Sequence, residues 1–533
     1  MITAKQKTLI YIITIFTVAA FFRFYDLEKR GLFEWDEGYY VELVKTHRAG
    51  FDYLIKTRIL GQNPGDLGVY IYENGGAFES VSKDGFTYFS ALASVIFGMS
   101  ENTILFTNAL IGALTALLIF IFLKERIFLD TAFLIGLAFS VSPYHIGYSR
   151  GGYSTIIGAF FLLISVYSYN RYLQTDKQPL LLYSGLALGI SFSCHYVIGY
   201  FVFVIFGYEF YRFLIKKATF KKLGTLVFVF SVPLLAVESV SRIIRSFSSR
   251  ISSQAPIVIN FFTFFEKFPR QILSADGAEA VKKFSQSYYL ENLILHEGFI
   301  IFILFFMLLG LIYQRKERLS NIFLVILISL PFVLLSLKYR GAGRVIPLFL
   351  PLIYFIIGWC MLYLKSWVRG VVIILIAISV FHNAYKSLDY FNYRSNFDQA
   401  LDYMYSHGSV KHLSDDMYVS RAYVGRKNVL DDFVSIAKEK NDDRYVSLQK
   451  IEELYYQGYK YLLLYDIPYH LNELTETALT MEPDFSTESI GNNRGVPYID
   501  LGLLRAKDSR PCRHIYVYSL DRVINKLESI IQD

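Results

Sequence analysis

Eleven apolar runs are the feature of this sequence that most restricts what the chain can fold into. A helix rises about 1.5 Å per residue, so roughly 20 apolar residues cross the hydrocarbon core of a membrane. Runs near that length lie at 8–25, 103–123, 130–148, 153–173, 180–195, 196–214, 223–242, 293–313, 319–337, 345–364 and 369–386. We therefore predict an α-helical polytopic membrane protein with about 11 spans, although 180–214 can be divided differently. The first run lacks a small-residue cleavage site, which favours an anchor over a cleavable signal.

The basic residues are distributed unevenly, and their distribution predicts the orientation of the spans. The chain has a formal net charge of +7 and is 54% hydrophobic. Its Lys and Arg residues gather in every second short loop, at 5–7, 124–126, 171–177, 212–222, 315–318 and 365–369. Loops that stay in the cytoplasm have this bias, so the charge needs no nucleic-acid partner. The N-terminus is then cytoplasmic, and 26–102, 243–292 and the tail lie outside.

The chain divides on this pattern into a membrane domain at 1–386 and a soluble extracytoplasmic domain at 387–533. Within the first, 243–292 mixes Ser, Pro and clustered Phe, which suits an amphipathic segment in the membrane plane. The tail has shorter apolar runs with charges between them. There "FDQALDYMYSHG" predicts a helix ending near Gly408, and "SLQKIEELYYQGYKYLLLYD" a helix ending at Gly458 followed by a buried strand. Since "RHIYVYSLD" predicts a further strand, we expect a small α/β domain.

An acidic pair stands just outside the first span, in "LFEWDEGYYVELVKT". The apolar residues that follow have helical spacing, so Asp36 and Glu37 fall in the first turn of a helix on the membrane surface. Carboxylates in a first turn are ordinary helix-start residues, which is one interpretation of the pair. A carboxylate at a membrane surface can also serve as a general base, which is the other.

Four further side chains fall at outer ends of spans or in outer loops. They are Lys83, Arg150, His195 and Arg344. Together they have the chemistry needed to hold an anionic phosphate. Each has an ordinary alternative. Lys83 and Arg150 can extend to lipid headgroups, and Asp84 can pair with Lys83. His195 can be a hydrogen-bonded structural residue, and Arg344 belongs to a basic outer turn. A phosphate-binding site is favoured because all four side chains are predicted to lie on the same side of the membrane.

In this order, the features resemble the C-type glycosyltransferases. The resemblance consists of one span, a "DE" pair opening an outer helix, a Lys-containing turn and "YFSALASVIFGMSENTILFTNALIGALTALLIF". It is nearest to the branch of protein O-mannosyltransferases and lipid A aminoarabinose transferases, and it covers about 1–385. It implies an enzyme that moves a sugar from a polyprenyl-phosphate carrier to an acceptor hydroxyl on the extracytoplasmic face, with inversion.

The resemblance also implies roles for particular residues. Asp36 falls on the catalytic acid of the family, and Glu37 beside it would orient the acceptor or the base. Lys83 falls on the lysine that touches the carrier phosphate. It is followed here by Asp84 and Gly85 rather than by two prolines, and the stretch "LGQNPGDLGVYIYENGGAFES" is inserted before it.

The remaining donor-phosphate candidates come from three later motifs. Arg150 lies in "SPYHIGYSRGGYS", in the second outer turn of the family. His195 lies in "GISFSCHYVIG", where some relatives have a lysine. Arg344 lies in "RGAGRVIPLFLPLIYFIIG", which resembles a late Arg- and Pro-containing element. The sequence therefore predicts that these side chains converge with Asp36 on one outer cavity.

The sequence indicates no cofactor and no metal site. Cys194, Cys360 and Cys512 are too few and too dispersed for a zinc site or a disulfide framework. Binding of a divalent metal stays possible through carboxylates of the inserted stretch, namely Asp66, Glu73 and Glu79. The expected partners are a polyprenyl-phosphate-linked sugar, a protein, lipid or glycan acceptor and the bilayer of the cell membrane.

Two other classes of protein fit part of the pattern. A transporter or a flippase for lipid-linked sugars would suit eleven spans, but such proteins place ionisable residues at mid-membrane. Here the candidate charges cluster outside, apart from Glu238 in the run that also contains Pro233. A scaffold or sensor that acts through its C-terminal domain is the third possibility. Turnover of a lipid-linked sugar separates the enzyme from both.

Overall fold

The computed structural model describes most of the chain. It covers 3–33, 35–76, 84–249, 287–314, 318–338, 343–414, 416–430, 444–465, 473–490 and 514–532. Three residues singled out above, Lys83, Glu79 and Cys512, lie outside these described residues. Most of the segment 243–292, for which a position in the membrane plane is predicted, lies outside them as well.

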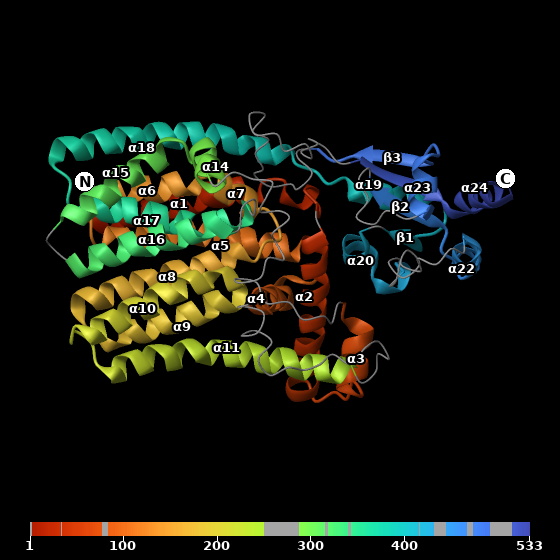
Figure 1. Cartoon of the computed structure of the whole chain (residues 1–533), viewed down its shortest axis with the longest axis horizontal. Coiled ribbons are helices and arrows are strands. Elements are labelled where there is room, and N and C mark those ends of the chain that lie inside the picture. Colours follow the sequence, from red (N-terminus) through yellow and green to blue (C-terminus); the bar gives the residue numbers. More distant parts are fainter. Residues whose placement is uncertain are drawn as a thin grey trace.

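A bundle of roughly parallel helices forms the larger part of the molecule (Figure 1). The helices of the bundle are α1 (Ala4–Phe24), α5 (Thr103–Lys124), α6 (Leu129–Ser140), α8 (Thr155–Thr175), α9 (Gln178–Cys194), α10 (Gly199–Leu214), α11 (Phe220–Ser249), α15 (Phe299–Tyr313), α16 (Arg318–Lys338), α17 (Leu350–Cys360) and α18 (Ser366–Ser387). Each of the eleven apolar runs overlaps one of these helices. The chain is a multi-pass membrane protein.

The number of spans differs from the predicted eleven. Among the described residues, eight helices are long and apolar enough to cross a membrane, or up to nine if one bent pair counts as a span. The helices α6 and α9 are apolar but shorter, which accounts for the remaining two runs. The count of eleven therefore stays a prediction.

Two apolar runs are broken where a single span was expected. The run 293–313 is divided between α14 (Tyr288–Glu297) and α15, whose axes meet at 116°. The break falls at Gly298, whose φ of +58° is a conformation that ends a helix and that glycine adopts without strain. The run 130–148 is divided between α6 and α7 (Pro143–Ser149), because Pro143 starts a new helix at its first position.

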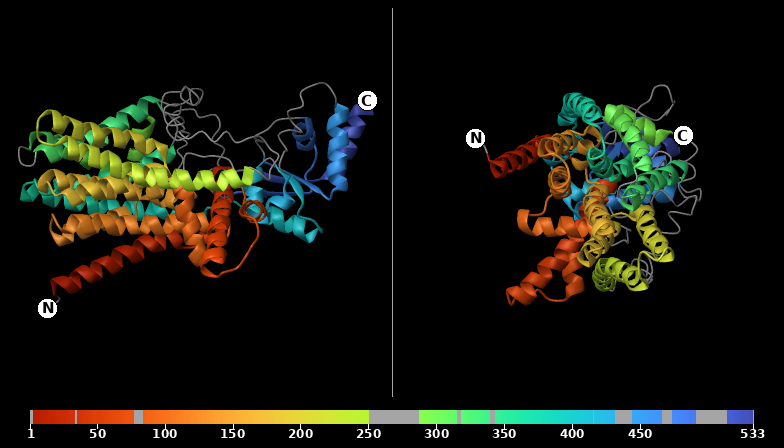
Figure 2. Two further views of the ribbon diagram at one scale, coloured as in Figure 1. Left: turned by 90° about the horizontal axis from the view of Figure 1, so that it is seen from below. Right: turned by 90° about the vertical axis from the view of Figure 1, so that its left-hand side faces the viewer.

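The helix predicted after the first span is present as α2 (Trp35–Leu54). It lies across one end of the bundle, with α3 (Leu67–Asn74) and α4 (Asp84–Phe97) beside it (Figures 1 and 2). Most of its length is buried, and its Tyr40 ring meets Phe86 of α4 edge to face at 5.3 Å. Asp36 and Glu37 occupy its first turn, as predicted.

Beyond α2 lies a four-stranded sheet with helices around it. Its strands are β1 (His412–Ser414), β2 (Tyr461–Tyr465), β3 (Phe485–Glu488) and β4 (His514–Ser519), in the order β1-β2-β4-β3. Only β1 and β2 are parallel. The accompanying helices are α19 (Phe397–Ser406), α20 (Met417–Val424), α22 (Arg444–Tyr456), α23 (Glu473–Leu479) and α24 (Leu520–Gln532). The α/β character predicted from the tail is confirmed, and α19, α22, β2 and β4 fall on the segments that predicted them.

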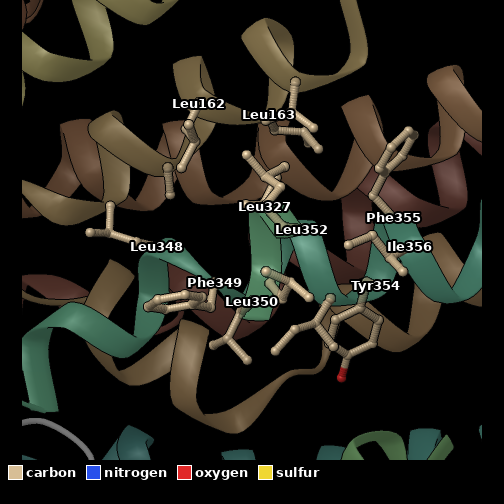
Figure 3. Packing of buried hydrophobic residues seen from close by; sticks show 14 of the residues in the cluster. Leu162, Leu163, Leu327, Leu348, Phe349, Leu350, Leu352, Tyr354, Phe355 and Ile356 are labelled. Atoms are coloured by element: carbon tan, nitrogen blue, oxygen red, sulfur yellow. The ribbon is translucent and has the colours of Figure 1, made fainter. Parts of the chain in front are cut away.

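Two apolar cores hold these parts. The first fills the bundle around α17, where Leu352, Phe355 and Ile356 pack against Leu162 and Leu163 of α8 (Figure 3). Lipid tails are as apolar as these side chains, so close packing rather than escape from water stabilises this core. The second core joins buried faces of α2, α4 and α5 to α19, α20 and the sheet. The C-terminal part therefore packs directly on the helix that carries Asp36.

Candidate active site

An ion pair joins the start of α2 to η5 (Gly343–Leu348), the 3-10 helix before α17. The guanidinium of Arg344 binds the carboxylate of Asp36, although the two residues lie 308 positions apart in the chain. Both side chains reach solvent, with 25% of Asp36 and 41% of Arg344 exposed. Asp36 and Arg344, two of the side chains predicted to converge, are therefore adjacent and partly open to solvent.

Glu37 is in a different environment from its neighbour Asp36. It is fully buried, and its oxygens lie 2.9 and 3.2 Å from the guanidinium nitrogens of buried Arg30. The backbone amides of Phe33 and Gly152 each donate to it at 2.7 Å. These contacts use the lone pairs of the carboxylate. Glu37 therefore fastens the first turn of α2 to the preceding loop and to the turn before α8.

The backbone beside Arg344 is surrounded by tyrosine hydroxyls from α7 and α14. Tyr144 donates to the carbonyl of Gly343 at 3.0 Å. A Cβ at Gly343 would lie 2.7, 3.0 and 3.3 Å from the hydroxyls of Tyr144, Tyr148 and Tyr288. The rings of Tyr144 and Tyr148 also stack, with centroids 5.2 Å apart. A side chain at position 343 would press on these hydroxyls, so the three tyrosines pack closely around the backbone that carries Arg344.

Aromatic side chains also border the ion pair. Tyr40 is 2% exposed and lies one turn after Asp36 on α2. Burial, reinforced by the negative charge of Asp36, raises the pKa of Tyr40 well above its usual value. Tyr40 is therefore a neutral hydrogen-bond donor at physiological pH. Tyr196, at the start of η3 (Tyr196–Ile198), lies within electrostatic reach of both Asp36 and Arg344.

His195 lies at the junction of α9 and η3, immediately before Tyr196. It is 2% exposed, and its Nδ1 accepts a hydrogen bond from the amide of Val197 at 3.2 Å. The start of α4 packs on the end of α9, since a Cβ at Gly85 would lie 2.1 Å from the Ser193 hydroxyl. The chain that follows Lys83 therefore approaches the junction that contains His195, although Lys83 itself is outside the described residues.

Arg150 contacts the end of α1 rather than the ion pair. It is 1% exposed, and it donates to the carbonyls of Phe22, Arg23 and Tyr25 at 3.4, 3.3 and 2.9 Å. Its guanidinium also lies 5.4 Å from the ring centroid of Phe391. Burial, with like charges nearby, lowers the pKa of Arg150 to about 9, which leaves it charged at neutral pH. The side chain serves as a C-terminal cap for α1.

Two of the carboxylates that left a metal open, Asp66 and Glu73, belong to α3 and the residue before it. Asp66 caps α3 by accepting from the amides of Gly68 and Val69, and Glu73 is exposed further along that helix. Within the part of the chain that the structure describes, no group of three or more His, Cys, Asp or Glu residues is placed to hold a metal ion. Cys194 and Cys360 are free and buried.

The sequence did not predict how closely the C-terminal part packs on α2. A Cβ at Gly38 would lie 2.4 Å from the amide nitrogen of Val419 in α20, so backbone meets backbone there. Lys45 of α2 donates to the carbonyls of Arg421 and Ala422, at 3.0 and 3.1 Å, at the end of α20. Glycine inside a helix is disfavoured unless another backbone comes close, so Gly38 was the one available signal.

The fold defines the class of protein. It is similar to that of AglB, an oligosaccharyltransferase of Archaeoglobus fulgidus, in a complex with an inhibitory peptide and a dolichol-phosphate. The identity is 13% and the TM-score 0.55, over 86% of this chain and 69% of that one. With the apo structure of the Archaeoglobus fulgidus enzyme, the identity is 15% and the TM-score 0.55, over 86% of this chain and 70% of that one. The chain therefore has the fold of the C-type glycosyltransferases, as its sequence predicted.

A family model and a further solved structure are also similar to this chain. Residues 85–237 match the family model of dolichyl-phosphate-mannose-protein mannosyltransferases. ArnT from Cupriavidus metallidurans, bound to undecaprenyl phosphate, has 15% identity and a TM-score of 0.47, over 79% of this chain and 75% of that one. No curated protein matches the chain. The family model and the fold agree with the predicted membrane glycosyltransferase that uses a lipid-phosphate-linked sugar donor.

Proposed function

We propose that this protein transfers a sugar from a polyprenyl-phosphate carrier to an acceptor hydroxyl at the extracytoplasmic membrane surface. The observation that carries the proposal is the pairing of Asp36 with Arg344. It brings a candidate base and a candidate phosphate ligand from distant parts of the chain to one end of a membrane bundle. The similar archaeal structure contains a dolichol-phosphate, which supports a lipid phosphate as the leaving group.

The reaction is a single displacement at the anomeric carbon of the sugar. The acceptor oxygen forms a bond to that carbon while the bond to the carrier phosphate oxygen breaks, and the bonding electrons leave with the phosphate. Asp36 takes the acceptor proton as the new bond forms. Arg344 stabilises the charge that develops on the departing phosphate. One base and no second nucleophile imply inversion of configuration.

The other candidate residues take supporting roles in this proposal. Lys83 completes the phosphate site, since Gly85 lies close to the end of α9. His195 is 2% exposed and positions its neighbour Tyr196 close to the ion pair. Glu37 and Arg150 position the site instead of touching the substrate, because both are buried in contacts with backbone and neighbouring side chains. The acceptor is a hydroxyl of a protein, a lipid or a glycan.

The orientation is part of the same proposal. The N-terminus of α1 and the C-terminal sheet lie at opposite ends of the bundle (Figure 1). The basic loops gather at the N-terminal end, where Lys7 pairs with Asp130 at 2.6 Å and Lys222 pairs with Asp176 at 2.6 Å. This end is cytoplasmic by the charge rule. The active site and residues 387–533, as a separate domain, are then extracytoplasmic.

The test uses membranes that contain the full chain and a polyprenyl-phosphate-linked sugar. Asp36→Asn should abolish release of the free carrier phosphate without lowering the amount of folded protein. The matched control is Asp52→Asn, which changes a carboxylate in the last turn of α2 that pairs with Arg48. That control should leave release unchanged. Normal release by Asp36→Asn would refute the proposed base. Movement of intact lipid-linked sugar without release would indicate a flippase.

A further inference from the structure

Asp36 and Arg344 bind each other, whereas the proposed reaction needs them to act on different groups. The base must accept a proton from the acceptor, and the guanidinium must hold the carrier phosphate. A carboxylate engaged with a guanidinium is a weaker proton acceptor, because its charged form is stabilised by the pair. The paired arrangement therefore corresponds to a site whose base is masked.

The pair has the properties of a contact that a phosphate can open. An ion pair that solvent reaches contributes little to stability, because water screens it and two side chains lose freedom. With 25% and 41% of the two side chains exposed, both ends of this pair are open to solvent. A phosphate accepts two parallel hydrogen bonds from one guanidinium, so it competes well with a carboxylate.

The backbone that carries Arg344 does not need to move in such an exchange. The carbonyl of Gly343 is held by Tyr144, and three tyrosine hydroxyls surround the position of its missing side chain. Residues 345–350, directly after Arg344, are buried in the core of the bundle. The side chain of Arg344 can therefore turn from Asp36 to the carrier phosphate while its backbone stays in place.

We propose that Arg344 exchanges Asp36 for the carrier phosphate, so that donor binding frees the base. This inference rests on the proposed function and adds an order of events to it. Without a carrier, Asp36 is neutralised by Arg344 and does not activate an acceptor. With a carrier, Arg344 moves to the phosphate and Asp36 becomes available to the acceptor hydroxyl. Tyr144 and Gly343 are positioning residues for the exchange.

The exchange predicts an unusual property of an inactive variant. In purified full-length protein, Asp36→Asn should bind undecaprenyl phosphate more tightly than wild type does, because the competitor for Arg344 is removed. We expect a gain of roughly two- to five-fold, which converts to about 0.4–1 kcal/mol for the loss of a competing ion pair that solvent reaches. Asp36→Ala should show the same gain, and the control Asp52→Asn should bind like wild type.

A double-mutant cycle distinguishes exchange from a general change in charge. Arg344→Ala should weaken binding of undecaprenyl phosphate several-fold. Adding Asp36→Asn to Arg344→Ala should then give no gain, since the group for which Asp36 competes is absent. An equal gain in both backgrounds would mean that Asp36 repels the phosphate directly, and the exchange would be wrong.

The outcomes separate this inference from the proposed function. Unchanged or weaker binding by the Asn and Ala variants, with release of carrier phosphate lost, would overturn the exchange and leave the base intact. Normal release by Asp36→Asn would overturn the proposed base, whatever the binding result. Tighter binding together with lost release supports both.

Discussion

At the scale of single residues, two adjacent carboxylates have different environments and should have different roles. Asp36 is partly exposed and faces Arg344, while Glu37 is buried among Arg30 and two backbone amides. Since a helix turns by about 100° per residue, neighbours in a first turn point to different sides. One side of α2 therefore faces Arg344 and the proposed substrate site, and the other fastens the helix to the protein.

This contrast predicts that two conservative substitutions differ in their effect on stability. Glu37→Gln leaves the buried charge of Arg30 without its counter-charge, which costs about 3–5 kcal/mol when a buried pair loses one partner. We expect a clearly lower midpoint of thermal unfolding for Glu37→Gln in detergent. The control Asp36→Asn breaks a pair that is partly open to solvent and should unfold closer to wild type. Equal unfolding midpoints for the two variants would contradict the distinction.

At the scale of elements, the contact between α2 and α20 should matter for both stability and activity. Gly38 lies two residues after Asp36, and its Cα faces the backbone of Val419. The contacts of Lys45 with the end of α20 extend this interface along α2. The C-terminal part therefore fixes the helix that carries the proposed base.

Gly38→Ala tests this interface. The added methyl group would enter the backbone of α20, and overpacking of this kind typically costs about 1–3 kcal/mol. We also expect a several-fold loss of transfer rate, because small displacements of a catalytic group are costly. The control Gly207→Ala adds a methyl group in α10, where nothing lies within 4 Å. It should be neutral or slightly stabilising. Full activity of Gly38→Ala would show that α20 does not position α2.

A strand of the C-terminal sheet should make stability depend on pH. His412 in β1 is fully buried, and burial lowers its pKa from 6.5 to about 4. Between these values the unfolded chain binds a proton that the folded chain does not. The free energy of unfolding therefore falls as the pH drops from about 6.5 towards 4, by at most about 1.4 kcal/mol per pH unit. Above 6.5 this effect is absent.

The measurement compares unfolding midpoints at several pH values between about 7.5 and 5. His412→Gln should lose part of the decrease seen in wild type over this range. The control His514→Gln changes a β4 histidine whose side chain is 44% exposed, and it should retain the wild-type slope. A wild-type slope in His412→Gln would rule out His412 as the cause.

At the scale of the whole molecule, periodicity and loop charge predicted most of the architecture. The helix that carries Asp36 and the strand after Gly458 follow from local spacing, and the placement of Arg344 at the same end of the bundle as Asp36 follows from counting spans. The contacts of Glu37 could not be predicted, because the amide of Gly152 has no signature in a sequence. The break at Gly298 was missed since hydropathy alone does not detect a bend within an apolar run.

The proposed orientation is the property of the whole molecule that most needs a direct test. Cys194 and Cys360 are buried, so labelling of exposed thiols can be read in a background in which Cys512 is replaced by Ser. Two exposed positions mark the two ends. Lys221 lies between α10 and the bulk of α11, and Tyr456, at the end of α22, is 85% exposed.

In intact cells, a membrane-impermeant thiol reagent should label Tyr456→Cys and should not label Lys221→Cys until the membrane is opened. The physical reason is that basic loops are retained in the cytoplasm, whereas the sheet lies at the opposite end of the bundle. Labelling of Lys221→Cys alone would invert the topology. The pair of Asp36 and Arg344 would then face the cytoplasm, and the donor would have to be a carrier whose sugar is exposed there. The two labelling patterns exclude each other, so one experiment decides on which side the proposed transfer occurs.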